Sequence, residues 1–226
     1  MYVVLFDIDG TLLHTGGAGG VSLLGAFRSV FDIPEPGRVP FAGRTDRWIV
    51  SRLFQLHGIE DTEPHWRAVR DEYLRQLVRE LPKHSGRVLP GVEWLLERLA
   101  ARDDVALGLL TGNTQRGAHL KLAHYQLDHH FGFGGFGDRQ RDRTDVAAEA
   151  LAAARRHVGR EVANQRVWVV GDTPLDVQCA RAVGVGAVAV ATGWHDREAL
   201  AASAPDLLLD SLEHPDALLV KLNGSH

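Results

Sequence analysis

The sequence predicts an α/β protein: a doubly wound parallel sheet, with an all-helical cap inserted after the first strand. From residue 88 onward, short apolar runs alternate with helical patterns, and such alternation is typical of a parallel sheet with helices on both faces. The apolar run YVVLF at 2–6 has the character of one more buried strand of that sheet. Between these regions, residues 14–85 show helical periodicity alone.

The composition fits one large domain with an insertion. The chain has 226 residues, of which 45% are hydrophobic, enough to bury a substantial core. Its net charge of −4, with both signs mixed along the chain, argues against a nucleic-acid partner. We expect no membrane association, because no long apolar run occurs. The single Cys179 allows no internal disulfide, so we expect a cytoplasmic protein. We also expect either a monomer or a homodimer.

Three helices are predicted within the insertion. Each has apolar residues spaced three or four apart, and glycine or proline stands near the helix ends. The predicted helices cover 21–31, 46–58 and 65–81. We therefore assign residues 1–13 and 86–226 to the core domain and residues 14–85 to the cap.

The rest of the chain supplies the remaining strands and helices of the core. Strands are predicted from apolar runs at 105–111, 166–170, 186–192 and 205–212, with a weak candidate at 131–137. Helices are predicted at 91–101, 114–127, 144–158 and 175–183. Most of these strands are separated by a predicted helix, as the crossover connections of a parallel sheet require.

Polar side chains follow three of the predicted strands, at the point where each strand ends. An Asp-Gly turn explains Asp9 and Gly10 but leaves Asp7 unexplained. Open parallel sheets bind ligands at the carboxyl ends of their strands. The residues that converge there are Asp7 and Asp9; Thr111, Gly112 and Asn113; and Asp172 and Asp176.

This set of residues is suited to phosphoryl chemistry. Clustered carboxylates repel one another unless a cation lies among them. Asp7, Asp9 and Asp172 offer hard oxygen ligands without histidine or cysteine, which favours Mg²⁺ over zinc. Thr111 and the backbone amides of Gly112 and Asn113, at the start of a helix, supply the neutral donors that bind a phosphate group.

The motifs DIDGT at 7–11, LLTGN at 109–113 and GDTPLD at 171–176 resemble the first, second and fourth motifs of the haloacid dehalogenase superfamily. The helical insertion resembles that family's first-type cap, on a Rossmann-like core. The resemblance covers nearly the whole chain. It implies a Mg²⁺-dependent phosphatase that hydrolyses a small organic phosphomonoester, similar to phosphoglycolate phosphatases.

Three other functions are compatible with parts of the pattern. A sugar phosphomutase of the same superfamily would keep all of these residues. A 2-haloacid dehalogenase would need neither Asp9 nor a metal cluster. A signalling receiver also has a doubly wound sheet and is phosphorylated on an aspartate. Receivers, however, usually carry adjacent acidic residues on the first strand and lack a long helical insertion.

The resemblance also implies roles for individual residues. Asp7 is expected to attack phosphorus and to form an aspartyl-phosphate. Asp9 is expected to protonate the leaving alcohol and then to activate water, while its backbone carbonyl joins Asp7 and Asp172 around Mg²⁺. Asp176 is expected to orient the metal or its waters. Thr111 is expected to act in catalysis, and Thr11, Gly112 and Asn113 to bind the substrate.

The sequence departs from the family at its third motif, a lysine commonly followed by proline. The only lysine between Thr111 and Asp172 is Lys121, which falls inside a predicted helix and in the wrong place. Basic residues occur instead in DRQRDRTD at 138–145. We assign the role to Arg143, next to the helix start, with Arg141 in reserve; the alternative is that these arginines are solvated.

Two loops of the cap have open interpretations. In AGRTD at 42–46, Arg44 is a candidate for substrate contact, while Thr45 or Asp46 is equally able to cap a helix. The segment TGGAGG at 15–20 is similar to a phosphate-binding loop but lacks its G-K-[ST] ending. We expect this segment to be a hinge that leads into the cap.

Overall fold

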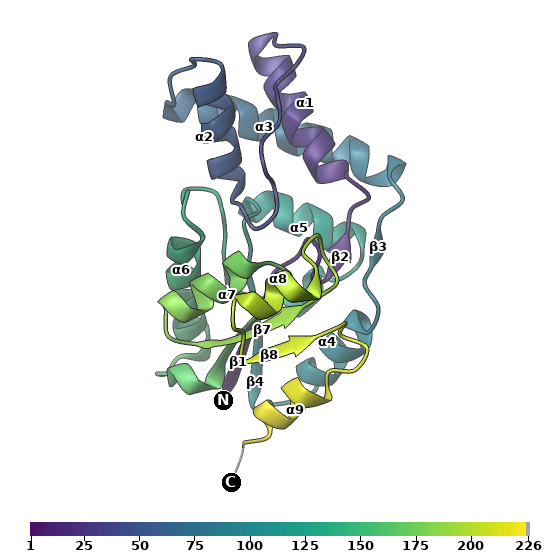
Figure 1. The fold of residues 1–226 in the computed structure, drawn as a ribbon, viewed down its shortest axis with the longest axis vertical. Coiled ribbons are helices and arrows are strands. Elements are labelled where there is room, and N and C mark those ends of the chain that lie inside the picture. Colours follow the sequence, from purple (N-terminus) through teal and green to yellow (C-terminus); the bar gives the residue numbers. More distant parts are fainter. Residues whose placement is uncertain (225–226) are drawn as a thin grey trace.

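The computed structural model describes residues 1–224 and contains a six-stranded parallel sheet (Figure 1). The strand order is β5-β4-β1-β6-β7-β8, so the predicted fold class is confirmed. The strands are β1 (Tyr2–Phe6), β4 (Val105–Leu110), β5 (Gly134–Gly135), β6 (Val167–Gly171), β7 (Gly186–Val190) and β8 (Leu207–Leu209).

The register of the central strands brings their carboxyl ends together. β1 lies between β4 and β6, and Phe6 is paired with Leu109 on one side and Val170 on the other. All three strands run in the same direction. The loops that follow them therefore meet at one edge of the sheet, which is where ligands of such sheets bind.

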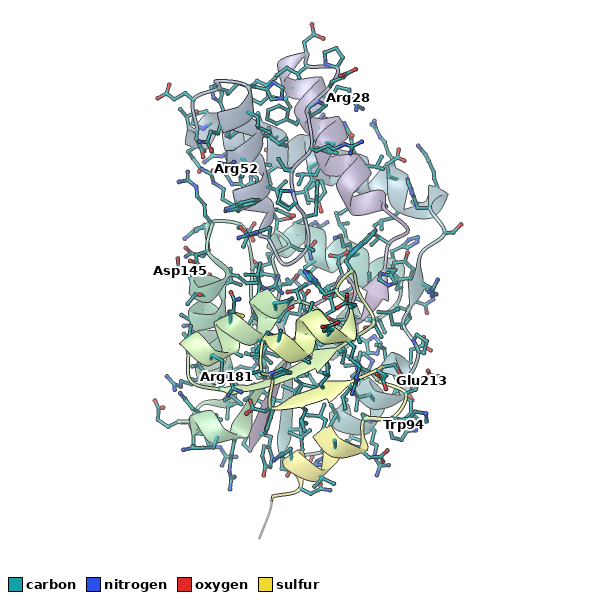
Figure 2. All side chains as sticks on the ribbon, viewed as in Figure 1. Arg28, Arg52, Trp94, Asp145, Arg181 and Glu213 are labelled. Atoms are coloured by element: carbon teal, nitrogen blue, oxygen red, sulfur yellow. The ribbon has the colours of Figure 1, made fainter. Side chains whose placement is uncertain are left out.

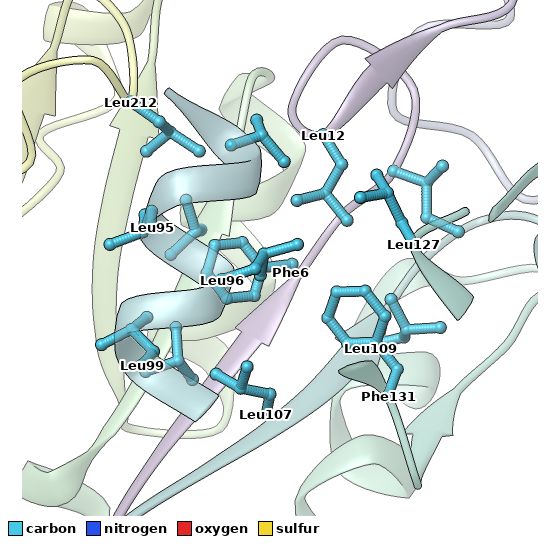
Figure 3. Close-up of a cluster of buried hydrophobic side chains, with 14 of the residues drawn as sticks. Phe6, Leu12, Leu95, Leu96, Leu99, Leu107, Leu109, Leu127, Phe131 and Leu212 are labelled. Carbon is cyan, nitrogen blue, oxygen red and sulfur yellow. The ribbon is translucent and has the colours of Figure 1, made fainter. Parts of the chain in front are cut away.

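Helices cover both faces of the sheet because successive side chains of a strand point to opposite faces. Val4 and Phe6 belong to the hydrophobic cluster under α4, α5 and α9. Phe6 lies beside Leu95, Leu96 and Leu99 of this cluster (Figure 3). Val3 and Leu5 belong to the cluster under α6, α7 and α8. These helices are α4 (Val92–Ala100), α5 (Gln115–His124), α6 (Arg143–Val158), α7 (Pro174–Ala182), α8 (Arg197–Ala202) and α9 (Asp216–Leu222).

The inserted segment forms three helices with a hydrophobic cluster of their own, at one end of the molecule (Figure 1). Phe27, Phe54 and Tyr73 are among the buried side chains of this cluster. The helices are α1 (Ala18–Phe31), α2 (Asp46–Leu56) and α3 (Glu63–Glu80). Charged side chains such as Arg28 and Arg52 lie on the outside of these helices (Figure 2).

The two chain segments that join core and cap lie side by side. β2 (Leu13–His14) pairs antiparallel with β3 (Arg87–Val88). No sequence pattern predicts this ribbon, because each of its strands has only two residues. The helices α8 and α9 are short and were also not predicted. No helix within residues 1–224 is long and apolar enough to cross a membrane.

Candidate active site

A cavity of about 890 Å³ lies between the cap and the carboxyl ends of the central strands. The core contributes mostly charged and polar side chains to its lining. These are Asp7, Asp9, Asn113, Lys121, Arg143, Asp172 and Thr173. The cap contributes its glycine-rich segment and several larger residues, among them Gly19, Gly20, Arg44, Asp46 and Tyr73.

Three buried carboxylates form the deep part of the site. One oxygen from each of Asp7, Asp172 and Asp176 lies within 4.8 Å of the others. Burial, opposed by Arg143, raises the pKa of Asp7 to about 6, and burial together with Asp7 raises the pKa of Asp172 to about 8. These raised values reflect first the free-energy cost of burying a negative charge and then the repulsion between neighbouring carboxylates, and a cation would reduce both. The donor set, carboxylates alone, fits a hard ion such as Mg²⁺.

The backbone after Asp9 must come very close to this cluster. Gly10 has φ +87°, and a Cβ built on it would lie 2.5 Å from Oδ2 of Asp172. Glycine tolerates this left-handed conformation and leaves the space free. The Asp-Gly pair therefore does form a turn, in which Gly10 N–H donates to the Leu13 carbonyl at 2.9 Å. The strand that follows the turn pairs with β3 rather than with β1.

Arg143 is the cation beside Asp7. Its Nη2 lies 3.0 Å from Oδ1 of Asp7 and 2.5 Å from Oδ1 of Asp176. Burial alone would lower the pKa of Arg143, but the carboxylates of Asp176 and Asp7 outweigh it and raise the pKa above its ordinary value. Arg141, the reserve candidate, is half exposed and pairs with Asp61 of the cap at 2.7 Å. Arg143 is therefore placed at Asp7, and Arg141 is not.

Both carboxylate oxygens of Asp176 accept hydrogen bonds. Its Oδ2 accepts from the backbone N–H and the hydroxyl of Thr173, at 3.0 and 2.7 Å, and its own N–H donates to Thr173 Oγ1 at 3.3 Å. This is a capping box at the start of α7. The other oxygen of Asp176 faces Arg143. In this arrangement Asp176 orients Arg143 and the first turn of α7.

Asp9 is held by a separate network. Its Oδ2 accepts from Lys121 Nζ at 2.6 Å and from Asn113 Nδ2 at 2.8 Å. Lys121 also donates to Asn113 Oδ1 at 2.6 Å, and Asn113 Nδ2 also donates to Thr111 Oγ1 at 2.8 Å. Both donors bind the same oxygen of Asp9. Its other oxygen is free of these bonds.

Lys121 is a residue of the site that sequence reasoning did not include. Lys121 does lie on a helix, α5, and shows no ion pair with Asp7, as expected of a residue that is not the missing third motif. It is nevertheless buried at the site, with an exposed fraction of 4%, and it lines the cavity. No local sequence signal distinguishes it, because its reach to Asp9 depends on how α5 packs against the end of β1.

The cap is docked on the core through the loop at 42–46. The Asp46 N–H donates to the Gly112 carbonyl at 2.7 Å, and the Asp46 carboxylate accepts from the Thr114 N–H at 2.8 Å. Burial raises the pKa of Asp46 to about 6. A Cβ on Gly112 would collide with the Arg44 carbonyl. The glycine of the second motif therefore allows the cap loop to approach.

Both interpretations of AGRTD have structural support. Thr45 caps α2, since its hydroxyl accepts from the Trp48 N–H at 3.0 Å. Arg44 lines the rim of the cavity, and its guanidinium carbon lies 4.4 Å from the ring centroid of Trp48.

The other predicted site residues, Thr11 and Thr111, are fully buried at the strand ends. Thr11 donates to Oδ1 of Asp172 at 3.4 Å.

A parallel α/β sheet whose central strands end in clustered aspartates, beneath a helical cap, defines a class of capped α/β hydrolases. Within that class, the family model for haloacid dehalogenase-like hydrolases matches residues 4–190. The chain belongs to this family. The resemblance seen in its motifs is thus confirmed, and so is the expectation of a phosphatase enzyme, which the curated relatives support.

The relatives that the chain matches are similar over most of its length. A phosphoglycolate phosphatase of Synechococcus elongatus is 28% identical over 218 residues, 93% of this chain and 93% of the relative. A phosphoglycolate phosphatase of Rhodospirillum rubrum is 30% identical over 199 residues, 84% of this chain and 80% of the relative. The crystal structure of a predicted phosphatase from Clostridium acetobutylicum has the same fold, with a TM-score of 0.71 at 19% identity, and covers 98% of this chain and 100% of that one.

Proposed function

We propose that the chain is a Mg²⁺-dependent phosphatase of the cytoplasm that hydrolyses a small organic phosphomonoester through an aspartyl-phosphate at Asp7. The observation that carries the proposal is the position of Asp7, between Arg143 and the carboxylate of Asp172 in a cavity under a cap. The names of the curated relatives favour a phosphoglycolate-like substrate. The buried free Cys179 is consistent with a reducing compartment.

In the first step, a carboxylate oxygen of Asp7 attacks phosphorus and the bond to the alcohol oxygen breaks. The leaving oxygen takes a proton from Asp9, whose carboxyl faces the cavity with one oxygen outside the Lys121 and Asn113 network. Arg143 offsets the charge of Asp7 as the phosphoryl group approaches. Its Nε is buried without a hydrogen-bond partner among the described residues.

In the second step, Asp9 takes a proton from water, the water oxygen attacks phosphorus, and the bond to Asp7 breaks. Inorganic phosphate leaves and both aspartates return to their first state. Asp7, Asp172 and the Asp9 carbonyl would hold Mg²⁺, which supplies positive charge to the phosphoryl oxygens. Thr111 and the amides of Gly112 and Asn113 lie at the start of α5, where they would donate to the phosphoryl group.

The proposal is tested by phosphate release from purified protein, with a panel of small phosphate esters, in Mg²⁺ and in a chelator. We expect release in Mg²⁺ alone and none from Asp7→Asn, because an amide does not attack phosphorus. The matched control is Asp145→Asn, an exposed carboxyl on α6. Full turnover by Asp7→Asn, or in chelator, would contradict the mechanism. Return of the phosphoryl group to another hydroxyl of a sugar substrate would indicate a phosphomutase instead.

A further inference from the structure

The glycine-rich segment TGGAGG brings the start of α1 against Lys121. Gly17 is the N-cap of α1, so Gly19 and Gly20 lie in its first turn instead of in a hinge loop. A Cβ built on Gly19 would lie 3.1 Å from Lys121 Nζ. Glycine at this position therefore leaves the room in which the ammonium group packs against the helix end.

The start of α1 has no group to balance its positive end. It has no side-chain cap and no acidic residue in its first turn, and the amides of Gly19 and Gly20 donate to none of the described residues. The N-terminus of a helix carries partial positive charge. The ammonium of Lys121 adds a full positive charge beside it, and an anion between the two would be bound by both.

Tyr73 independently indicates a ligand in the same part of the cavity. Its side chain comes from α3, is 1% exposed and lines the cavity. Its hydroxyl lies near Gly117, one turn before Lys121 on α5, and makes no hydrogen bond with any described residue. Burial, with Asp46 and Asp9 adding to it, raises the pKa of this hydroxyl well above 10.0, so it is a donor at neutral pH.

We infer that Lys121, the first-turn amides of α1 and the Tyr73 hydroxyl form a binding site for a carboxylate of the substrate. The inference rests on the proposed function for the position of the ester. Asp9 must reach the leaving oxygen, and Lys121 Nζ lies 2.6 Å from Asp9. The carboxylate would therefore be linked to the ester oxygen through three hydrogen bonds in series, by way of Asp9 and Lys121, which favours phosphomonoesters whose alcohol part also carries a carboxylate.

Two charged groups of the cap line the same cavity. Arg44 is exposed at the rim, and its guanidinium is stacked on Trp48. Among the described residues Lys121 forms an ion pair with Asp9, and Arg44 does not. Asp46 would repel a substrate carboxylate, but its own carboxylate already accepts from the Thr114 N–H. Lys121 is thus the cation of this cavity that contacts Asp9, next to the leaving oxygen.

The experiment compares two ligands that differ in one group, 2-phosphoglycolate and 2-hydroxyethyl phosphate. Calorimetry with the Asp7→Asn variant measures the affinity ratio without turnover. We expect 2-phosphoglycolate to bind about 10- to 100-fold more tightly, as for a charge-assisted contact. Lys121→Met should bring the ratio close to one, and Gly19→Ala should lower it, because the added methyl displaces Nζ. Val21→Ala, exposed on the same helix, is the matched control and should leave the ratio unchanged.

Each outcome bears on the site separately from the proposed function. Equal affinities in the unaltered cavity, or a ratio that Lys121→Met does not change, would overturn the assignment. A larger fall in the ratio for Arg44→Ala than for Lys121→Met would overturn it in favour of Arg44. If Lys121→Met lowers turnover of both esters equally and leaves the binding ratio intact, Lys121 only positions Asp9. Absence of turnover with every ester refutes the proposed function, while the binding ratio still tests the site.

Discussion

Arg143 holds two carboxylates at once, because its Nη2 lies 3.0 Å from Asp7 and 2.5 Å from Asp176. We expect Arg143→Ala to lower kcat about 10² to 10³-fold, the usual loss when one preorganised donor to a developing charge is removed. Arg143→Lys should recover part of this, since it restores the charge but not the planar fork. Steady-state kinetics at a temperature where circular dichroism shows both variants folded makes the measurement.

The control for this prediction is Arg141→Ala. Arg141 is half exposed and pairs with Asp61 of the cap, so its loss should leave the chemical step nearly intact. If Arg141→Ala loses most of its kcat while Arg143→Ala stays close to wild type, the third-motif role belongs to Arg141 instead of Arg143. If neither substitution matters, the charge at Asp7 is balanced by a group other than these arginines.

Asp46 should make the free energy of unfolding decrease as pH rises. Its pKa is about 6 in the folded protein against an ordinary 3.8, so its contribution to stability is present below pH 4 and is lost as pH rises through 6. The pKa of Asp46 is higher by about two in the folded protein than in the unfolded chain. At about 1.4 kcal/mol for each pKa unit, this difference changes the free energy of unfolding by at most ~3 kcal/mol. Asp46→Asn should therefore raise the free energy of unfolding at pH 7.5 and change it much less at pH 4, as measured by urea unfolding.

Asp61 provides a control of the opposite sign. Although burial opposes it, hydrogen bonds from Arg47 and Ser51 lower the pKa of Asp61. Its stabilising contribution is present above pH 4 and is lost as pH falls. Asp61→Asn should thus destabilise the protein at pH 7.5 more than at pH 4. The same pH trend for both variants would show that the ionisation of Asp46 is not the cause.

At the scale of elements, the capping box of α7 contributes both to the stability of the protein and to the geometry of the active site, because Thr173 and Asp176 form it. Thr173→Ala should lower the free energy of unfolding by about 1 kcal/mol, the usual cost of losing an N-cap. It should also reduce activity, because Thr173 orients the Asp176 carboxylate that faces Arg143. Thr62→Ala removes the cap of α3 and should cost similar stability with little loss of kcat. Equal activity losses in the two variants would contradict the link between cap and site.

The elements that can be predicted from the sequence are those whose signal is local. Strand ends are recognisable from apolar runs, so the rule for parallel sheets is enough to bring Asp7, Asp9 and Asp172 together. Arg143 could be assigned to the role of the third-motif lysine because it stands next to the start of a predicted helix. The β2 and β3 ribbon could not be predicted, since two residues carry no periodicity. The glycine pair of β5 lies within the weak candidate at 131–137.

Lys121 and the start of α1 show the limit of this reasoning. Lys121 has the spacing of an ordinary helix residue, and TGGAGG is typical of a flexible loop. Their meeting depends on the packing of α5, α1 and the end of β1 in three dimensions. Contacts between elements far apart in the sequence leave no periodic trace in either one, so neither residue could be assigned from the sequence alone.

At the scale of the whole molecule, the folded state should be coupled to Mg²⁺ in a pH-dependent way. The pKa values of Asp7 and Asp172, about 6 and about 8, lie above the ordinary 3.8. Protons therefore compete with the ion between pH 4 and pH 8, and the metal-free protein loses stability as pH rises through this range. We expect Mg²⁺ to raise Tm more at pH 8 than at pH 6, as measured by differential scanning fluorimetry.

Variants identify the source of this Mg²⁺ effect. Asp172→Asn should abolish most of the Tm shift, whereas Asp145→Asn, exposed on α6, should retain it. A shift of equal size at pH 6 and pH 8 would mean that the ion does not replace protons on Asp7 and Asp172. A shift that survives Asp172→Asn would place the ion elsewhere.

The pairing of β2 with β3 has a consequence for how this protein could diversify. Because the chain leaves and rejoins the core at neighbouring positions, Leu13–His14 and Arg87–Val88, the segment between them can be exchanged for that of a relative as a single cassette. We expect such a chimaera to keep the reacting aspartates and Arg143 while inheriting the donor's substrate preference. Lys121 stays behind with the core, however, so a compatible donor must carry a residue as small as Gly19 where its first helix meets that ammonium.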